Sequence, residues 1–291
     1  MALSFLLAAC SLILLAGQVP YSERDMTDFD TVFNALKGKG TWTVGENDSI
    51  AFFTPNEAAK DPNWRPMQTG RWIYTDWGWM LRSDEPGAWA TLHYGYWTRK
   101  GHDHWVWVPG GDWQIHTVDW RATDKYIGWR PVKLDRMGNF ITGSEADNVD
   151  PLDWSFIPIE KFGLDMSPKD FLSVEETAKI LPLSAPASHI IKIWDNVERP
   201  GPDPVLIYKK NKTQFLTVEL KTLPSISTPP PYDSPVEYFL YRPTFFQDFD
   251  GMIHRVKILL SKEDTSTLAK PQVQEIEKKI WQDNGLKPRH P

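Results

Sequence analysis

The segment YGYWTRKGHDHWVWVPGGDW, residues 94–113, decides the fold because four of its residues are tryptophans. Successive side chains of a strand point to opposite faces, so Trp105 and Trp107 share one face and two valines share the other. Since both faces are apolar, we predict that this strand is buried between two layers. Most of the tryptophan rings are therefore expected in a hydrophobic core.

The hairpin plan of this segment recurs along the chain. Three further stretches combine apolar alternation with a turn signal: residues 40–55 (GTW to AFFTP), 72–80 (WIYTDWGWM) and 117–129 (TVDWRATDKYIGW). An isolated hairpin is only marginally stable in water. The repetition therefore predicts antiparallel Trp-rich hairpins that pack into a sheet or barrel-like domain.

Around this domain the sequence predicts a few short helices and a smaller α+β C-terminal part, so the fold class is mainly β. Apolar residues at helical spacing predict a helix over residues 28–37. Later helices are expected over residues 167–181 and 271–285. Strands are expected at PVLIY (204–208), FLTVEL (215–220), VEYFLYRP (236–243) and MIHRVKILL (252–260), the last two as a pair.

We divide the chain into five parts on this pattern. They are a signal peptide (1–17), a Trp-rich β-hairpin repeat domain (28–150), an α+β extension (151–223), a Pro-rich linker (224–235), and a strand pair followed by a C-terminal helix (236–291).

The N-terminal segment predicts export. Residues 2–17 are an apolar run of the length of a signal-peptide core, although no Lys or Arg precedes it, and cleavage is expected near Ala16–Gly17. Alternatively, residues 7–10 form a lipoprotein cleavage box with Cys10 as the lipid acceptor. Cys10 is the only cysteine, so a conventionally cleaved chain has no disulfide. We expect a location in the periplasm, cell envelope or surface of a bacterium, with membrane contact only through the signal segment or a lipid anchor at Cys10.

Charge and motifs exclude several functional classes. The net charge is −6, and residues 61–130 hold equal numbers of basic and acidic side chains, so no basic stripe is available for nucleic acid. Phosphate-cradling glycine loops and a nucleophile elbow are absent from the sequence. We therefore expect no nucleic-acid partner and no cofactor.

Several segments of the Trp-rich region resemble a known family. They are GRWIYTDWGW (70–79), SDEP (83–86), HYGYW (93–97), WVWVPG (105–110) and YIGWRP (126–131). Over about residues 29–135 the chain is similar to an uncharacterised family of exported Trp-rich bacterial proteins with a domain of unknown function. That family usually has a tryptophan after the Asp-Glu-Pro, where this chain has Gly87. The resemblance implies export and a β-rich domain, and it supplies no activity.

Five residues are candidates for ligand binding. Trp77 lies at a turn, and Trp89 and Trp113 lie in connections, so these rings are expected to be exposed. Arg71 and Arg82 alternate with tryptophans, as in a clamp for an anionic glycan or a carboxylate. The structural alternative for the arginines is cation–π packing on indole faces.

Two further constellations suggest chemistry. Asp84 and Glu85 are candidates for one half of a glycosidase carboxylate pair, with Asp76 or Asp112 as the partner. Their structural alternative is to order a turn before Pro86. His102 and His104 share one strand face at a spacing that suits a metal ion, although polar residues are expected at a hairpin tip anyway.

The sequence leaves three functional hypotheses. The first is a non-catalytic envelope protein whose Trp-rich module binds a cell-wall glycan or an envelope protein. The second is an envelope polysaccharide hydrolase that uses Asp84 or Glu85. The third is a structural or assembly protein of the envelope without a small ligand. Exposed indole favours the first, because a flat apolar face suits a sugar ring.

Overall fold

The computed structural model describes part of the chain. The described residues are 23–44, 51–100, 104–111, 113–115, 118–134, 140–141, 150–187, 191–193, 197–199, 201–225, 227–243, 256–257 and 259–260. The predicted signal peptide with Cys10 and the predicted helix at 271–285 lie outside them. None of the described helices combines the length and apolarity needed to cross a membrane.

The first sheet joins two of the predicted hairpins. Its strand order is β1 (Gly40–Val44), β2 (Ala51–Pro55), β6 (His104–Val108) and β5 (Tyr96–Lys100), and every pairing is antiparallel. The hairpins meet where Phe53 lies opposite Trp107. All four apolar residues of the WVWV segment are buried, which confirms that strand β6 lies between two layers.

Helix α1 (Glu23–Ala35) packs against the first sheet. Phe29, Val32 and Phe33 are buried, as their helical spacing predicted, and the Phe33 ring stacks on that of Trp42 at 5.5 Å between centroids. Two short helices, α2 (Asn56–Lys60) and α3 (Ala88–Thr91), lie in the connections between hairpins.

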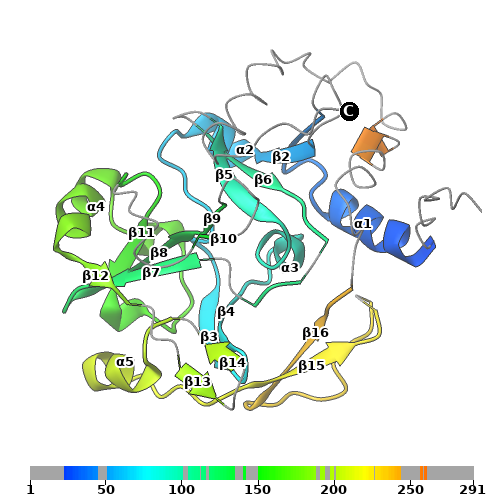
Figure 1. Ribbon diagram of the computed structural model, residues 1–291. Coiled ribbons are helices and arrows are strands. Elements are labelled where there is room, and N and C mark those ends of the chain that lie inside the picture. Colours follow the sequence, from blue (N-terminus) through cyan, green and yellow to red (C-terminus); the bar gives the residue numbers. More distant parts are fainter. Residues whose placement is uncertain are drawn as a thin grey trace, which may run out of the picture.

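The second sheet crosses residue 150, where we predicted the boundary of the Trp-rich domain. Its order is β11 (Ser155–Pro158), β8 (Tyr126–Pro131), β7 (Val118–Ala122) and β12 (Ala185–Pro186). The predicted hairpin at 117–129 forms its centre, and later residues supply both outer strands (Figure 1).

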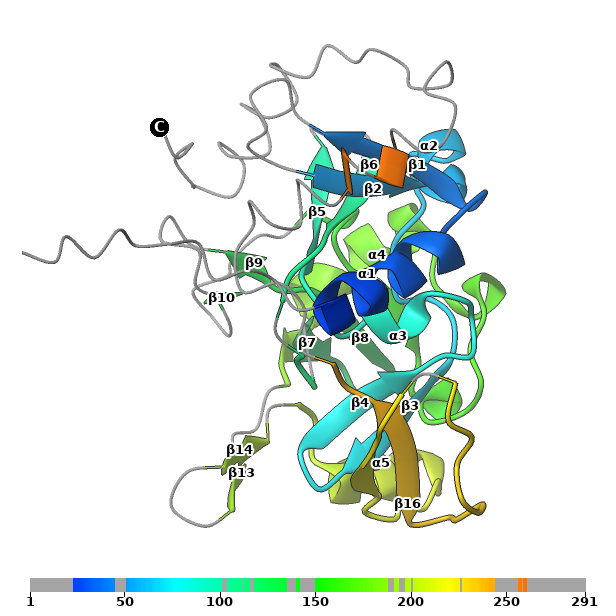
Figure 2. The ribbon, with the colours of Figure 1, turned by 90° about the vertical axis from the view of Figure 1, so that its right-hand side faces the viewer.

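The remaining predicted hairpin, β3 (Arg71–Thr75) with β4 (Gly78–Arg82), has two buried faces. Trp72, Tyr74 and Trp79 belong to the main core, whereas Met80 packs towards Leu220. That second face meets the parallel pair β15 (Glu219–Leu223) and β16 (Glu237–Tyr241). In Figures 1 and 2 this pair lies beside β3–β4, at the end of the molecule away from the first sheet.

The remaining described elements are short. They are the strand pairs β9 (Lys133–Leu134) with β10 (Phe140–Ile141) and β13 (Ile191–Ile193) with β14 (Val197–Arg199), the helices α4 (Val174–Ile180) and α5 (Pro204–Asn211), and 3-10 turns at Ile159–Lys161, Pro168–Asp170 and Leu181–Leu183. Among the described strands, the sheets stay separate and do not close, so the fold is mainly β without the barrel-like closure that we considered.

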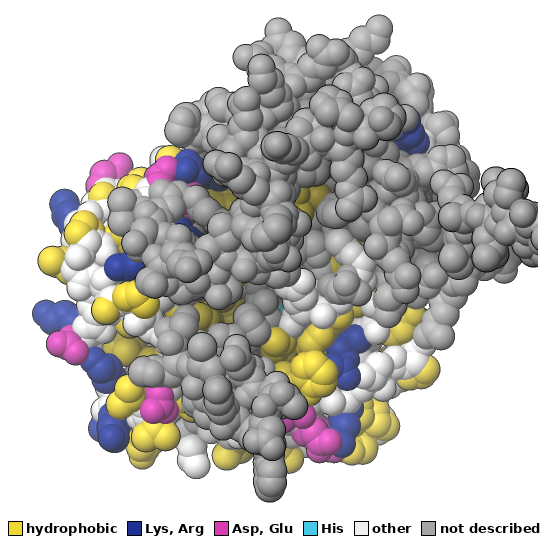
Figure 3. Space-filling view, in the orientation of Figure 1, with side chains coloured by type: hydrophobic (Ala, Val, Ile, Leu, Met, Phe, Trp, Pro, Cys, Tyr) yellow, Lys and Arg dark blue, Asp and Glu magenta, His cyan; other side chains and the backbone are white. Residues whose placement is uncertain are grey.

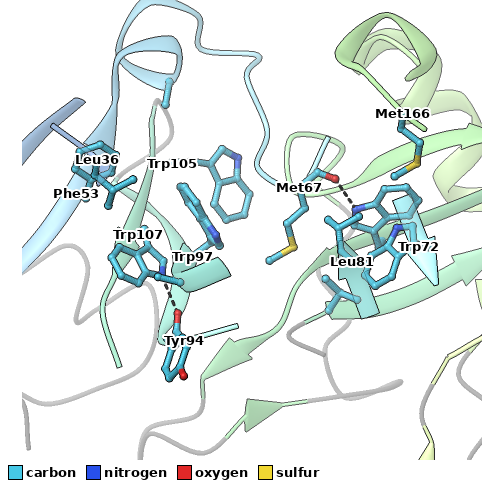
Figure 4. Close-up of a cluster of buried hydrophobic side chains, with 14 of the residues drawn as sticks. Leu36, Phe53, Met67, Trp72, Leu81, Tyr94, Trp97, Trp105, Trp107 and Met166 are labelled. Carbon is cyan, nitrogen blue, oxygen red and sulfur yellow. Dashed lines mark hydrogen bonds between the residues drawn. The ribbon is translucent and has the colours of Figure 1, made fainter. Parts of the chain in front are cut away.

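Indole rings dominate the core. Figure 4 shows two groups of rings, one around Trp107 and one around Trp72, with Met67 between them. In the second group Trp72 meets Trp120 edge-on at 4.5 Å and Trp129 at 5.4 Å between centroids. Edge-to-face pairs contribute about 0.5–1.5 kcal/mol each beyond the area that they bury. The repeats therefore stabilise one another chiefly through aromatic contacts between hairpins.

A buried guanidinium ties this core to later residues. Arg65 donates hydrogen bonds to the Trp154 carbonyl, to the Leu172 carbonyl at 2.6 Å and to the Thr177 hydroxyl at 3.2 Å. Burial lowers the pKa of Arg65 to about 10, against the opposing effect of Asp61. The side chain therefore stays charged at neutral pH, and its acceptors come from beyond residue 150.

Helix α5 corrects the strand that we predicted at PVLIY. Asp203 accepts the Val205 N–H at 2.8 Å, Pro204 occupies the first helical position, and Lys212 ends the helix with φ of 61°. A capping acidic residue followed by proline is a helix start signal. Five apolar residues alone do not distinguish a strand from a buried helical turn.

The structure also differs from our expectation in one helix boundary, one element type and one strand pairing. The helix expected at 167–181 begins only at Val174, because Ser173 and Glu176 form a reciprocal capping box. Described residues 256–257 and 259–260, within the expected strand MIHRVKILL, are helical. Strand β16 pairs in parallel with β15, and the described residues of that segment form no strand.

Gly128 provides a test of the packing between β8 and β11. A Cβ atom at this position would lie 2.5–2.7 Å from the Phe156 ring. We expect Gly128→Ala to lower the free energy of unfolding by about 1–3 kcal/mol, as overpacking does. Urea unfolding measures this loss. Phe156→Leu should lower the free energy of unfolding less in the Gly128→Ala protein than in the native one. Additive losses of free energy would contradict the predicted close contact.

Candidate functional site

Trp77 is presented by a fixed turn. It lies between β3 and β4, where the Thr75 hydroxyl accepts the Trp77 N–H at 3.0 Å and donates to the Gly78 carbonyl at 2.7 Å. Trp77 is 50% exposed, in contrast to nine other described tryptophans, which are buried. Its ring meets the half-buried Trp113 ring at 6.1 Å with an interplanar angle of 84°.

Arg242 completes this group. Its guanidinium carbon lies 5.4 Å from the Trp77 ring centroid and 5.1 Å from that of Trp113. Its Nε and Nη2 atoms donate to the Thr222 hydroxyl at 3.1 and 2.5 Å. Two indoles and one hydroxyl therefore fix a guanidinium that follows directly after strand β16. We call Trp77, Trp113 and Arg242 the aromatic platform.

His93 supports the platform from within. Its ring stacks on that of Trp113 at 5.4 Å with an interplanar angle of 28°, and its Nδ1 atom lies 3.0 Å from the Gln114 carbonyl oxygen. Burial lowers the pKa of His93 to about 4, although backbone hydrogen bonds of Gln114 and Leu81 oppose the shift. His93 is therefore neutral at physiological pH.

A small hollow of about 180 Å³ lies between β4 and β16, beside the platform. Arg82 and Trp89 line it, and the Arg82 guanidinium lies 5.0 Å from the Tyr238 ring centroid. The Trp89 ring is half-buried and lies 6.3 Å from that of Tyr241. Figure 3 shows hydrophobic side chains next to basic and acidic ones over β15 and β16. Four of the five predicted ligand residues thus lie along β16.

Arg71 lies apart from this surface. It faces Arg82 in the register of the hairpin, but it binds both carboxylate oxygens of Asp165, at 3.0 and 2.6 Å. The hydrogen bonds from Arg71 lower the pKa of Asp165. This guanidinium is therefore already occupied by a protein carboxylate.

The other Trp-neighbouring arginines serve packing. Arg121 and Arg130 lie over the Trp154 ring at 5.8 and 5.0 Å, and Arg130 also forms a buried ion pair with Asp119 at 3.2 Å. With Arg65, they belong to the interior and not to a ligand clamp.

The structure separates two of the candidate carboxylates. Asp84 is an exposed partner of Arg82 at 3.7 Å, whereas Asp76 accepts the Leu220 N–H at 3.2 Å. The two residues flank β4, whose five residues cover about 16 Å. A glycosidase pair needs carboxylates about 5–10 Å apart, so Asp76 cannot serve Asp84 or Glu85 in that way. Asp112 lies outside the described residues.

The predicted metal site is described only in part. His104 begins β6 and has a buried Nδ1 atom that makes no hydrogen bond in the structure, whereas His102 lies outside the described residues. Within the described ranges, no three histidine, cysteine or acidic side chains gather as metal ligands.

Sequence reasoning missed Tyr238 and Arg242, and it considered His93 only as a neighbour of the predicted metal site. We assigned VEYFLYRP only to a strand, and nothing in its pattern reveals that this strand lies against β4. The one available signal is that its apolar residues fall on both faces, which indicates a strand covered on two sides. Arg242 directly follows the last residue of that strand, and the sequence does not show which side chains it contacts there.

A larger hollow of about 650 Å³ lies between the β7–β8 turn, α5 and β12. It is mostly apolar, with Leu183 and Leu206 exposed at its rim. The charged side chains Lys210 and Asp124 pair with each other there at 2.8 Å, so they leave no fixed unpaired charge of their own to orient a ligand.

Comparison with known proteins identifies one family. Residues 33–136 match the family described as "Family of unknown function (DUF6600)". The comparisons with curated proteins and with solved structures found no match. The expected resemblance to an uncharacterised family is thus confirmed over this segment. It contains Trp77, Trp89 and Trp113, whereas β16 and Arg242 lie beyond it.

Two neighbouring tryptophans give a matched test of the surface assignment. We expect Trp77→Ala to lower the free energy of unfolding by about 1 kcal/mol or less, since only surface ring contacts are lost. Trp79 is buried and donates its indole N–H to the Pro202 carbonyl at 2.7 Å, so Trp79→Ala should cost about 3–5 kcal/mol. Urea unfolding compares the two, and equal losses would place Trp77 in the core.

The pKa of His93 predicts acid sensitivity. The folded-state pKa of about 4 lies below the ordinary 6.5, so the unfolded chain takes up the proton first as the pH falls. This contribution to stability is complete above pH 6.5 and is lost between pH 6.5 and 4, by about 3 kcal/mol in full. Unfolding free energies across this range should fall less steeply in His93→Asn. Parallel curves for the two proteins would refute the prediction.

Proposed function

We propose that this protein is a non-catalytic binding protein of the bacterial cell envelope whose aromatic platform binds a cell-wall glycan. The observation that carries the proposal is the half-exposed Trp77 ring, fixed by a turn in a chain that buries most of its indoles. Among the described tryptophans nine are buried and Trp77 alone is exposed, in a defined orientation, which favours a binding role for it.

The chemistry of the platform suits a sugar. An indole offers a flat apolar face to the C–H groups of a sugar ring, and its N–H is free to orient a hydroxyl. In the described part of the chain, neither Trp77 nor Trp113 donates its indole N–H to a protein acceptor. Because the rings are held in place before binding, little side-chain entropy is lost on association.

Binding is favoured over hydrolysis for a further reason. The best acidic candidates, Asp84 and Glu85, are exposed at a turn, and Asp76 lies too far along β4 to serve as their partner carboxylate. The location in the envelope rests on the apolar N-terminal segment of the sequence, with its cleavage site or lipid acceptor. Fractionation of the native cells tests that assignment, and a cytosolic protein would contradict it.

The function is tested by co-sedimentation of the purified protein with cell-wall sacculi and insoluble polysaccharides, while tryptophan emission is recorded. We expect binding with a blue shift, and Trp77→Ala should weaken it by about tenfold or more. Tyr208→Ala is the matched control, because Tyr208 is a similarly exposed aromatic residue on α5.

Three results would contradict the proposal. They are the absence of binding to every glycan, equal binding by Trp77→Ala, and equal losses in Trp77→Ala and Tyr208→Ala. Sacculi treated with protease beforehand distinguish a glycan partner from an envelope protein that remains attached to the sacculi. Binding that disappears after this treatment would assign the platform to an envelope protein.

A further inference from the structure

We infer that the glycan carries a carboxylate, which the Arg242 guanidinium binds while Trp77 contacts the sugar ring. This inference rests on the proposed function and names the ligand class for the same site. It follows from the contacts of Arg242, from the charges around it and from its distance to Trp77.

The contacts of Arg242 leave one edge of its guanidinium open. Thr222 accepts from Nε and Nη2, and the indoles of Trp77 and Trp113 lie within 5.4 Å of the guanidinium carbon. The Nη1 hydrogens are not used by these contacts. An arginine held in this way presents a planar pair of donors that matches the two oxygens of a carboxylate.

The protein supplies no counter-charge of its own within the described residues. None of the described carboxylates lies within ion-pair distance of Arg242. The nearby acidic residues are engaged elsewhere: Glu219 and Glu237 bind Lys221 at 2.5 and 3.6 Å, and Asp76 accepts a backbone N–H. In a chain of net charge −6, an immobilised cation without an acidic partner among the described residues is a local feature that suits an anionic ligand.

Distance limits the shape of this ligand. Because the guanidinium carbon lies 5.4 Å from the Trp77 ring centroid, one sugar ring with its own carboxylate can touch both groups. Arg82, over Tyr238, marks the other end of β16, four residues or about 13 Å from Arg242 along an extended strand. Its surface pair with Asp84 is weak and exchangeable, so Arg82 is available to a second carboxylate of a polymer.

The test compares polygalacturonate with its methyl ester, which keeps the sugar ring and removes the charge. We expect the native full-length protein to bind the acid polymer more tightly, and added salt to weaken only this binding. Arg242→Gln should weaken acid-polymer binding by about tenfold to a hundredfold and leave the ester unchanged. Arg242→Lys should fall between, because it keeps the charge without the planar donors.

Arg71→Gln is the matched control, since Arg71 already binds Asp165, and it should bind both polymers as the native protein does. Trp77→Ala should weaken both polymers equally. Thermal unfolding checks that each variant is folded, and the acid–ester comparison on the native protein needs no variant.

Several outcomes separate this inference from the proposed function. Equal affinity for acid and ester, or an equal loss for both in Arg242→Gln, would overturn the carboxylate and leave glycan binding in place. Binding only to uncharged polysaccharides would do the same. Preference for a phosphate-bearing polymer over the carboxylated one would also overturn it. If no glycan of any charge binds, the proposed function itself fails.

Discussion

Every buried indole brings a polar N–H into the interior, and the structure depends on where those N–H groups find acceptors. An unpaired buried donor costs about 1–3 kcal/mol, so nine buried tryptophans cannot be placed by apolar packing alone. Four of them donate to backbone carbonyls outside the regular strands, those of Pro202, Thr91, Tyr94 and Met67. The connections between elements are therefore drawn into the core and fixed there. The buried N–H groups of Trp42, Trp72 and Trp120 find no acceptor among the described residues, so the packing of these rings has to offset that cost.

This interior supports a group of rings at the surface. Trp113 is half-buried and packs on the neutral ring of His93. The Trp77 ring contacts that of Trp113 from a turn that the Thr75 hydroxyl closes. The support comes from β3–β4 on one side and from β15–β16 on the other. A platform built on two packed layers keeps its geometry without a ligand, which distinguishes it from a flexible aromatic loop.

The hairpins could be predicted because both of their signals, the alternation of apolar residues and the turn residues, lie within a few neighbouring positions. The four predicted hairpins, the buried WVWV strand and the exposure of Trp77 follow from neighbouring residues alone. Long-range pairing has no such local signal, so the sequence did not reveal that β11 and β12 flank β8 and β7. Arg242 was missed for the same reason: its contacts with Trp77 and Trp113 join residues more than a hundred positions apart. PVLIY was mistaken for a strand because its cap, Asp203, was not weighed against its apolar run.

The completion of the second sheet by residues beyond 150 has a consequence for synthesis. When the segment that matches the family has left the ribosome, β7 and β8 still have open edges, and Arg65 lacks its acceptors at Trp154, Leu172 and Thr177. Open strand edges and an unpaired interior charge both delay a stable fold and expose the chain to aggregation. The Trp-rich segment therefore cannot complete its second sheet, or pair the Arg65 guanidinium, before its own later residues are available.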